Sequence, residues 1–291
     1  MNITPRFLSN KYKIRLHDQL NDFICSNIGT INHHDKNSLC WAKTTQKLRE
    51  YQIGTVICNE NHFSEINPNN NIVYMTCNNP RLLFAKIVNQ EFSHLLPDNF
   101  TNDVNKHRKN RNIIIGENVF IGQNVSIGNG TKIEHNTTIY SNTLIGENCN
   151  IGSSVSIGTS GLGLEKDPDT NILISFPQIG GVIIEDFVDI GPHSTIRRSA
   201  LQNTTISRGT KIGSLCNVGH NSVIGENCIL TSNIIIAGSS KIGHDVFFGI
   251  GCTVKNAITI GNNCTLGQSS VIIDKIPNNE TWIGNPAKKF K

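Results

Sequence analysis

The sequence contains no long hydrophobic run. Nowhere in its 291 residues do about 20 apolar residues follow one another, the length that a membrane-spanning helix needs. Residues 1–20 also lack the short apolar segment of a secretory signal peptide. We therefore expect a soluble cytoplasmic protein with no transmembrane segment.

The nine cysteines include no Cys-x-x-Cys pair and no metal-ligand spacing. An odd number cannot close completely into intrachain disulfides, which favours a reducing compartment and no structural metal. Five cysteines fall where the repeat described below requires a small apolar side chain: Cys149, Cys216, Cys228, Cys252 and Cys264. We interpret these five as buried packing residues rather than reactive thiols.

A dense basic surface is also missing. The formal net charge is only +4, and Lys and Arg are scattered along the chain. This composition argues against a dedicated nucleic-acid surface, although it allows a smaller basic site for the phosphates of a cofactor or nucleotide.

What the sequence does contain is an aliphatic residue at about every sixth position from residue 113 to 284, often followed by Gly. The first unbroken register is Ile115, Ile121, Ile127, Ile133, Ile139, Ile145, Ile151 and Ile157. It resumes at Ile184, Ile190 and Ile196, and then runs Ile206, Ile212, Val218, Ile224, Leu230, Ile236, Ile242, Phe248, Val254, Ile260, Leu266 and Ile272.

A period of six fits neither a helix nor a simple strand, so each unit must be a short strand followed by a corner. Gly, Asn and Asp suit the corners, because they tolerate positive φ or bond their own backbone. The residue two positions before each large aliphatic is small or β-branched and points to the same face. Three units make a coil of roughly 18 residues, and stacked coils bury a common core. The sequence therefore predicts a parallel β-helix.

Residues 1–96 differ from the repeat and predict a small α/β domain. Residues 53–58 and 71–75 look like buried strands, and residues 45–51 and 81–92 look helical. Pro80 suits the start of the second helix, with Asn78 or Asn79 as its cap.

The polar residues 97–112 predict an exposed linker, and residues 113–291 form the repeat domain. Two insertions interrupt the repeat, at residues 159–181 and 197–202, and residues 273–291 form a C-terminal cap. Loops that leave a solenoid tend to lie on its binding face. Gly161 and Gly163 in the longer insertion would allow a ligand or a neighbouring chain to approach the backbone closely.

Three histidines follow the large aliphatic residue by two positions, at corners: His135, His220 and His244. Two of them would share an edge only if a multiple of about 18 residues separated them, so a three-histidine zinc site is disfavoured. A corner histidine is usually a solvated surface residue, which is our interpretation of His135 and His244.

For His220 the surroundings suggest more. Gly219 precedes it and should open space beside it, and Gly238 should lie one coil further on, directly beneath it. A neutral imidazole can accept a proton from an amine or hydroxyl, and the N–H of Gly238 could stabilise an oxyanion. Both features fit acyl transfer, but they fit structural corners equally well.

Several stretches of the chain carry a further pattern: GLGLEKDPDTNILISFPQIGGVIIEDFVDIGPHSTIRRSAL, SLCNVGHNSVIGENC, IAGSSKIG, IGTVIC and NNPRLLFAKIV. These stretches resemble the UDP-3-O-(3-hydroxyacyl)glucosamine N-acyltransferase (LpxD) family of lipid A synthesis. The resemblance implies a left-handed parallel β-helix, a homotrimer with active sites between subunits, and acyl transfer from a thioester to a sugar amine.

Carried over by position, His220 matches the general base, Gly238 the oxyanion glycine, and Trp41 an aromatic that stacks on uracil. We add candidate contacts to the nucleotide sugar at Ser214, Asn217 and Asn221. Candidate contacts to the acyl donor are Gly161, Gly163, Asn256, Lys288 and Lys289.

The chain also departs from the family pattern. It has Gly213-Ser214 where the family carries Asp-Asn, Ala257 where the family has a second histidine, and AKTTQKL after Trp41 in place of the family's Asn and Tyr. The family's C-terminal helices are missing. The ending WIGNPAKK is instead similar to coenzyme A-dependent hexapeptide acyltransferases, in which a basic tail lies near the cofactor's phosphates. A solvated tail is the alternative.

We therefore predict an N-acyltransferase for a nucleotide-linked amino sugar, with acyl-CoA preferred over acyl carrier protein as the donor. The alternatives are the family's own reaction with 3-hydroxyacyl carrier protein, O-acylation, and a non-catalytic scaffold that binds sugar nucleotides. Arg197 and Arg198 could contact a phosphate or form an ion pair at a trimer interface.

Overall fold

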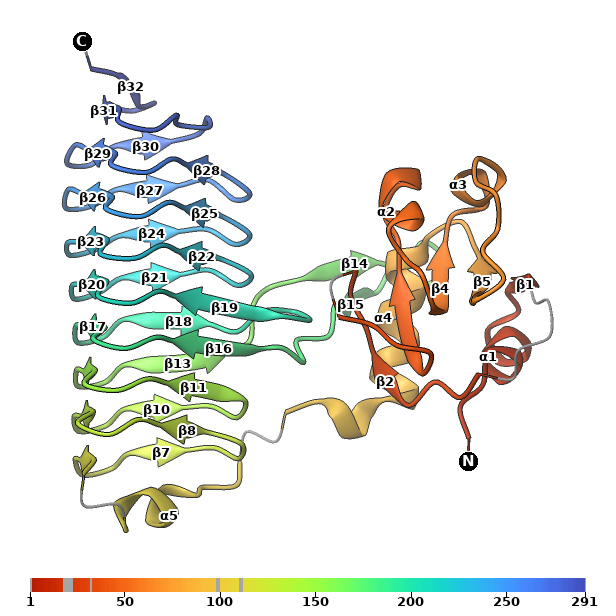
Figure 1. Cartoon of the computed structure of the whole chain (residues 1–291), viewed down its shortest axis with the longest axis horizontal. Helices are drawn as coiled ribbons and strands as arrows, with labels where there is room; N and C mark the ends of the chain where they lie inside the picture. The colour runs from red at the N-terminus through yellow and green to blue at the C-terminus, as the bar shows by residue number, and fades with distance from the viewer. Residues whose placement is uncertain (1, 18–22, 32, 98–99, 110–111, 291) are drawn as a thin grey trace. The chain divides into compact units, whose positions relative to one another are not determined.

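The computed structural model describes residues 2–17, 23–31, 33–97, 100–109 and 112–290. The chain forms two compact units (Figure 1). One unit comprises residues 1–96 together with 162–177, and the other comprises residues 97–161 together with 178–291. Each is described by itself below.

Among the described residues, the first unit contains a five-stranded sheet in the order β1-β5-β4-β3-β2, parallel except for β1. Its strands are β1 (Arg15–His17), β2 (Asn27–Ile28), β3 (Ser38–Trp41), β4 (Gly54–Cys58) and β5 (Ile72–Thr76). Every residue of β4 and β5 is buried, as expected for central strands covered on both faces. These are the two strands that the sequence predicts.

The described part of this unit also contains helices. They are α1 (Pro5–Tyr12), α2 (Thr45–Arg49), α3 (Glu60–Ser64), α4 (Pro80–Glu91) and the 3₁₀ helix η1 (Ser93–Leu95). Helix α4 packs against β3 and β4 and buries Leu82, Leu83 and Ile87. The side chain of Asn79 caps α4 by accepting the N–H of Leu82 at 3.1 Å, and Pro80 occupies the first turn. The predicted start of this helix is therefore confirmed.

The middle of the longer insertion belongs to this first unit, although we expected the whole insertion to extend the repeat domain. It forms the hairpin β14 (Leu164–Lys166) and β15 (Leu173–Ser175), which packs on α4. Lys86 pairs with Asp167 at 2.8 Å, and Asn89 donates to the carbonyl of Ser175 at 2.9 Å. These contacts hold residues 162–177 to the small domain.

The second unit is a stack of coils built from parallel sheets on three faces (Figure 1). The fold class predicted from the sequence is confirmed: a left-handed parallel β-helix that follows a small α/β domain along the chain.

In the described part of this unit, the eight-stranded sheet contains β7 (Phe120–Ile121), β10 (Thr138–Ile139), β13 (Ser156–Thr159), β18 (Thr195–Arg197), β21 (Asn217–Val218), β24 (Ile235–Ile236), β27 (Thr253–Val254) and β30 (Val271–Ile272). The seven-stranded sheet, counted over the same residues, contains β8 (Ser126–Ile127), β11 (Thr143–Ile145), β16 (Gly181–Ile184), β19 (Asn203–Ile206), β22 (Val223–Ile224), β25 (Lys241–Ile242) and β28 (Thr259–Ile260). The ten-stranded sheet, likewise counted, contains β6 (Ile114–Ile115), β9 (Lys132–Ile133), β12 (Asn150–Ile151), β17 (Asp189–Ile190), β20 (Lys211–Ile212), β23 (Ile229–Leu230), β26 (Phe247–Phe248), β29 (Thr265–Leu266), β31 (Thr281–Ile283) and β32 (Lys288–Lys289).

Strand pairing reproduces the predicted coil length. Ile139 pairs with Ile121 on one side and Ile157 on the other, a separation of 18 residues each time. The two insertions lengthen single coils, since Ile157 pairs with Ile196, 39 residues on, and Ile196 pairs with Val218, 22 residues on. The register of the core therefore survives both interruptions.

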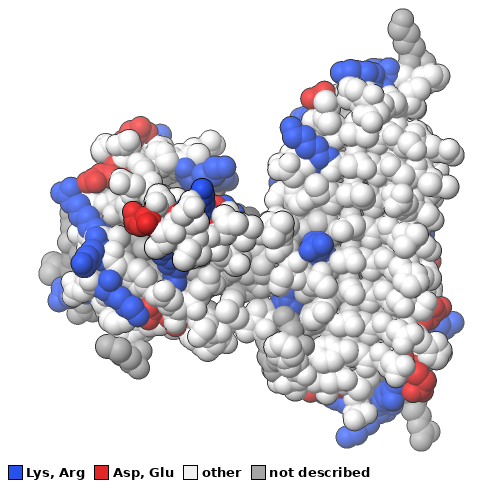
Figure 2. Space-filling model, turned by 180° about the vertical axis from the view of Figure 1, so that it is seen from behind, with Lys and Arg blue, Asp and Glu red and all other residues white. Residues whose placement is uncertain are grey.

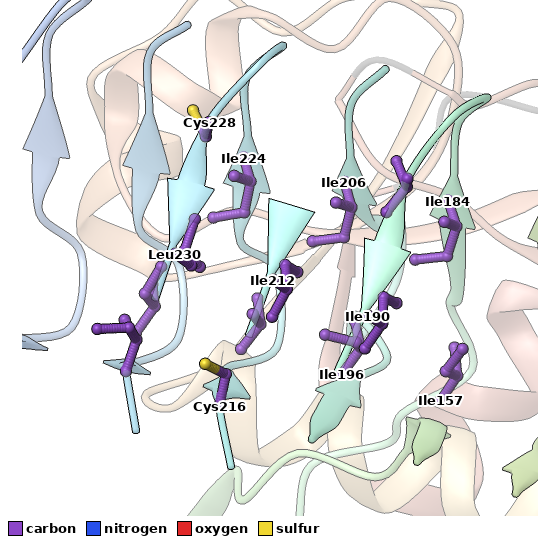
Figure 3. Close-up of a cluster of buried hydrophobic side chains, with 14 of the residues drawn as sticks. Ile157, Ile184, Ile190, Ile196, Ile206, Ile212, Cys216, Ile224, Cys228 and Leu230 are labelled. Carbon is purple, nitrogen blue, oxygen red and sulfur yellow. The ribbon is translucent and has the colours of Figure 1, made fainter. Parts of the chain in front are cut away.

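The interior is a column of aliphatic side chains with cysteines beside them (Figure 3). The five cysteines predicted to pack in the core are buried, and all nine cysteines are free thiols. Burial raises the pKa of the Cys228 thiol to about 11, so this group is not a thiolate at neutral pH.

Both ends of the column are covered. Residues 97–112, predicted to be an exposed linker, include helix α5 (Val104–Arg108), and Val104 packs against the core. At the C-terminus, Ala287 is buried, and Trp282 packs against the core from β31. Within residues 273–291, β31 pairs with its antiparallel partner β32.

Candidate active site

One edge of the β-helix collects the residues proposed for chemistry. This site edge is the set of corners that connect the eight-stranded sheet to the seven-stranded sheet, including the corners at residues 219–221, 237–239 and 255–257. The N–H of Ser239 donates to the carbonyl of His220 at 2.7 Å, and the N–H of Ala257 donates to the carbonyl of Gly238 at 2.9 Å. His220, Gly238 and Asn256 therefore occupy three successive coils of one edge.

The imidazole of His220 lies close to two glycines. A methyl group added to Cα of Gly238 would lie 2.6 Å from Nε2 of His220, and one added to Gly161 would lie 2.7 Å from its Cβ, Cγ and Cδ2. Neither position can accept a side chain without movement of the ring. The placement of Gly238 beneath His220, predicted from the coil length, is confirmed, and Gly161 of the longer insertion contacts the same ring.

Gly219 has a different role from the one expected. A methyl group on Gly219 would lie 2.5 Å from the backbone nitrogen of Gly238, so this glycine allows two coils to stack rather than opening space beside His220.

Asn221 links His220 to the shorter insertion. Its Nδ2 lies 2.9 Å from Nδ1 of His220, and its Oδ1 accepts hydrogen bonds from the hydroxyl of Ser199 and, at 2.8 Å, from the N–H of Ala200. Its own N–H donates to Oγ1 of Thr204 at 3.0 Å. Asn221, predicted to contact the substrate, thus has both ends of its amide bonded to its own chain.

Sequence reasoning did not identify Ser199, Ala200 and Thr204. The sequence did indicate that this loop is near the site. The shorter insertion interrupts the coil before His220, so it must project from the β-helix at the same edge. The six-residue pattern carries no information on which side chains such a loop turns inward.

The two arginines of the shorter insertion do not behave alike. Arg198 is completely buried, and its guanidinium donates to the carbonyls of Gly158 at 2.6 Å and Ser141 at 3.1 Å. Burial lowers the pKa of Arg198 to about 10, which leaves the group charged at neutral pH. Arg198 therefore links the backbones of neighbouring coils from inside the protein. A buried side chain bonded in this way fits neither role proposed from the sequence, a phosphate contact or an ion pair at a trimer interface. Arg197 is half-buried and donates to the carbonyl of Ser160 at 3.0 Å.

The structure does not bring all predicted site residues together. Ser214 lies at a corner between the ten-stranded and eight-stranded sheets, on another edge, and Asn217 lies on strand β21, which leads into the His220 corner. Lys288 and Lys289 belong to the ten-stranded sheet, where Lys289 pairs with Glu280 at 2.7 Å.

The other corner histidines lie on other edges. His135 follows β9 of the ten-stranded sheet, and His244 follows β25 of the seven-stranded sheet, whereas His220 follows β21 of the eight-stranded sheet. The prediction that His220 and His244 occupy different edges is confirmed. The described residues contain no group of three or more His, Cys, Asp or Glu that could hold a metal ion.

Trp41 and Gly163 belong to the first unit. The indole of Trp41 packs against Phe84 of α4 and Phe176 of the insertion, at ring-centroid distances of 6.4 and 6.1 Å. The guanidinium of Arg81 lies 4.6 Å from the centre of the Phe176 ring. The carbonyl of Gly163 accepts the N–H of Phe176 at 2.8 Å, so Gly163 helps to place this aromatic ring.

The surface charge agrees with the composition. Figure 2 shows Lys and Arg scattered over one face, with much of the stacked coils carrying neither charge. Among the described segments, no helix is both long and apolar enough to cross a membrane.

Comparison with known families identifies the repeat. The profile described as "Bacterial transferase hexapeptide (six repeats)" matches residues 124–159, and the one described as "Hexapeptide repeat of succinyl-transferase" matches residues 241–272.

Curated relatives carry the name UDP-3-O-acylglucosamine N-acyltransferase. The protein of Caulobacter sp. (strain K31) is 36% identical over 119 residues, which are 41% of this chain and 35% of the relative. That of Geobacter sp. (strain M21) is 51% identical over 77 residues, which are 26% of this chain and 22% of the relative. The matched segments thus span about a third or less of each relative's length.

Solved structures share the fold. LpxA from Acinetobacter baumannii superposes with a TM-score of 0.54 at 23% identity, covering 62% of this chain and 67% of that one. The UDP-N-acetylglucosamine acyltransferase from Campylobacter jejuni gives a TM-score of 0.52 at 21% identity, covering 62% of this chain and 73% of that one. The chain therefore contains hexapeptide repeats, and segments of it are similar in sequence to proteins named UDP-3-O-acylglucosamine N-acyltransferase.

Proposed function

We propose that this protein transfers an acyl group from a thioester to the amine of a sugar linked to UDP. The observation that carries the proposal is the close approach of Gly161 and Gly238 to the His220 ring, because Gly238 also carries a backbone N–H. Within the described chain, no backbone or side-chain acceptor takes that N–H. A proton acceptor next to an uncommitted backbone donor is the arrangement that acyl transfer requires.

In the proposed reaction the sugar amine attacks the thioester carbonyl, forming a C–N bond and a tetrahedral oxyanion. His220 accepts the proton that the amine loses, at Nε2, and the N–H of Gly238 donates to the oxyanion. Collapse of the intermediate breaks the C–S bond, and the proton held by His220 passes to the departing sulfur.

The name of the relatives bears on the substrate. It specifies N-acylation of a UDP-linked 3-O-acylglucosamine, so we place this reaction ahead of a coenzyme A-dependent reaction on another amino sugar. Trp41 would stack on the uracil from the small domain, and Asn256, exposed two coils beyond His220, would contact the donor. Lys288 and Lys289 remain predicted contacts to the donor's phosphates.

We further propose that the protein works as a homotrimer. Apolar side chains on the outer faces of the β-helix support association, since Leu144, Val223 and Ile235 are 48, 39 and 45% exposed. Light scattering should give about three times the 32.0 kDa mass of one chain.

The test is an assay with UDP-3-O-acylglucosamine and two donors, 3-hydroxyacyl carrier protein and 3-hydroxyacyl-CoA, with the product identified by mass spectrometry. Transfer from the carrier protein alone would support the reaction of the named relatives. Transfer from the CoA thioester alone would support the coenzyme A-dependent alternative.

His220→Ala should lower kcat by roughly 10²- to 10⁴-fold, the range for loss of a general base. His135→Ala is the matched control, because it removes a corner histidine from a different edge and should leave kcat unchanged. Full activity of His220→Ala would refute the assignment of the base. Binding of the sugar nucleotide without turnover on any thioester would favour a non-catalytic scaffold.

A further inference from the structure

The amide of Asn221 connects the proposed base to the shorter insertion. Its nitrogen lies 2.9 Å from Nδ1 of His220, and its oxygen accepts hydrogen bonds from Ser199 and from the N–H of Ala200 at 2.8 Å. The two ends of the amide thus face different partners.

The partners fix which end is which. The backbone N–H of Ala200 can only donate, so the Asn221 atom that faces it must be the oxygen. The other end of the amide is then the NH₂ group, which also can only donate. Nδ1 of His220 must therefore accept, and the neutral ring carries its proton on Nε2.

The surroundings hold the amide in this orientation. Asn221 has φ of +59°, a conformation that Asn tolerates better than most residues, and its N–H is bonded to the buried Thr204. Ser199 is buried as well, and its hydroxyl oxygen accepts the N–H of Gln202 at 3.2 Å. Rotation of the amide by half a turn would place two donors, the NH₂ group and the Ala200 N–H, against each other.

This orientation has a consequence for catalysis that rests on the function proposed above. A ring that already carries its proton on Nε2 cannot accept another at that atom. To act there, His220 needs the other tautomer, in which Nε2 is unprotonated and Nδ1–H donates to an oxygen. Asn221 can supply that oxygen only after its amide has turned.

We propose that Asn221 is a positioning residue that keeps His220 in the Nε2–H tautomer, and that release of its amide from residues 199–200 readies His220 to accept a proton. In this step one proton leaves Nε2 to water and another binds Nδ1 from water, so the ring stays neutral. The amide oxygen turns from Ala200 to Nδ1–H. The substrate amine then delivers its proton to the vacated Nε2, and the shorter insertion controls when this happens.

The direct test is ¹⁵N NMR of the whole protein labelled at histidine, at a pH where no imidazole is charged. The His220→Gln variant identifies the signals of His220. We expect an unprotonated Nδ1 and a protonated Nε2 in the unliganded protein. Asn221→Asp should invert this pattern, because a carboxylate of the same shape can accept Nδ1–H as well as the Ala200 N–H. A protonated Nδ1 in the unsubstituted protein would overturn the proposal, whether or not the protein transfers acyl groups.

The kinetic test compares kcat with KM. A minor state is typically populated at about 0.1–10%, so Asn221→Asp should raise kcat about tenfold or more with little change in KM. Asn233→Asp makes the same change at a corner with φ of +60° on another edge, and should alter neither constant. An inverted tautomer without a rise in kcat would overturn the release step. Absence of any transfer by the unsubstituted protein would instead count against the proposed function and leave the NMR result standing.

Discussion

Replacement of Gly238 by Ala adds one methyl group directly under the proposed base. The added carbon would lie 2.6 Å from Nε2 of His220, whereas ordinary contact begins at 3.4 Å, so the ring must move by about 0.8 Å. The room for this movement is limited, because Gly161 also lies close to the ring. The backbone at Gly238 does not have the positive φ that disfavours Ala, so the effect is one of space alone.

The size of the effect follows from this displacement. A misplacement of about 1 Å in a reacting group can cost about 10²-fold in rate, which corresponds to about 2.7 kcal/mol of transition-state stabilisation. Crowding of a packed site also lowers stability, typically by about 1–3 kcal/mol. We expect Gly238→Ala to stay folded and to lose roughly 10²-fold in kcat/KM.

The assay is steady-state transfer to the UDP-linked sugar, with the folded fraction measured by urea unfolding. Gly249→Ala is the matched control, since its methyl group would lie 2.7 Å from the backbone nitrogen of Gln268, on an edge without His220. Because its methyl group meets backbone atoms, it should cost at least as much stability, and it should leave kcat/KM within about threefold. If Gly238→Ala kept the full kcat/KM, the ring would not be held as the structure indicates.

Three further predictions concern stability and the thiols. Arg198→Met leaves the carbonyls of Gly158 and Ser141 without their donors, so the free energy of unfolding should fall by about 2–4 kcal/mol; an unchanged urea midpoint would contradict this. The Lys86 ammonium lowers the pKa of the Asp167 carboxyl in the folded protein. The pair therefore stabilises the folded state above the pKa of an unfolded Asp, about 3.9, and this stabilisation is lost as the pH falls through the lower folded pKa. Asp167→Asn should therefore reduce the loss of stability below about pH 4, and equal acid sensitivity in both proteins would disprove the pairing. The buried thiols, including Cys228, should react with a disulfide reagent only after unfolding, and rapid labelling of the native protein would show otherwise.

The sequence determined the scaffold because a β-helix is specified locally. Each six-residue unit contains its own strand and corner, so the spacing from Ile121 to Ile139 to Ile157 already encodes which residues stack. The same arithmetic placed Gly238 beneath His220 and separated His220 from His244. The cysteines of the repeat followed too, since their position before each large aliphatic residue required a small apolar side chain.

Only the tertiary structure decided what the insertions do. Loops have no period, and their side chains pack on partners that are distant in sequence. No spacing rule brings Gly161 to the ring of His220, turns Ser199 toward Asn221, or buries Arg198 among the carbonyls of other coils. The periodic part of the chain thus fixed the position of His220, whereas the aperiodic insertions, through contacts between distant residues, fixed its surroundings.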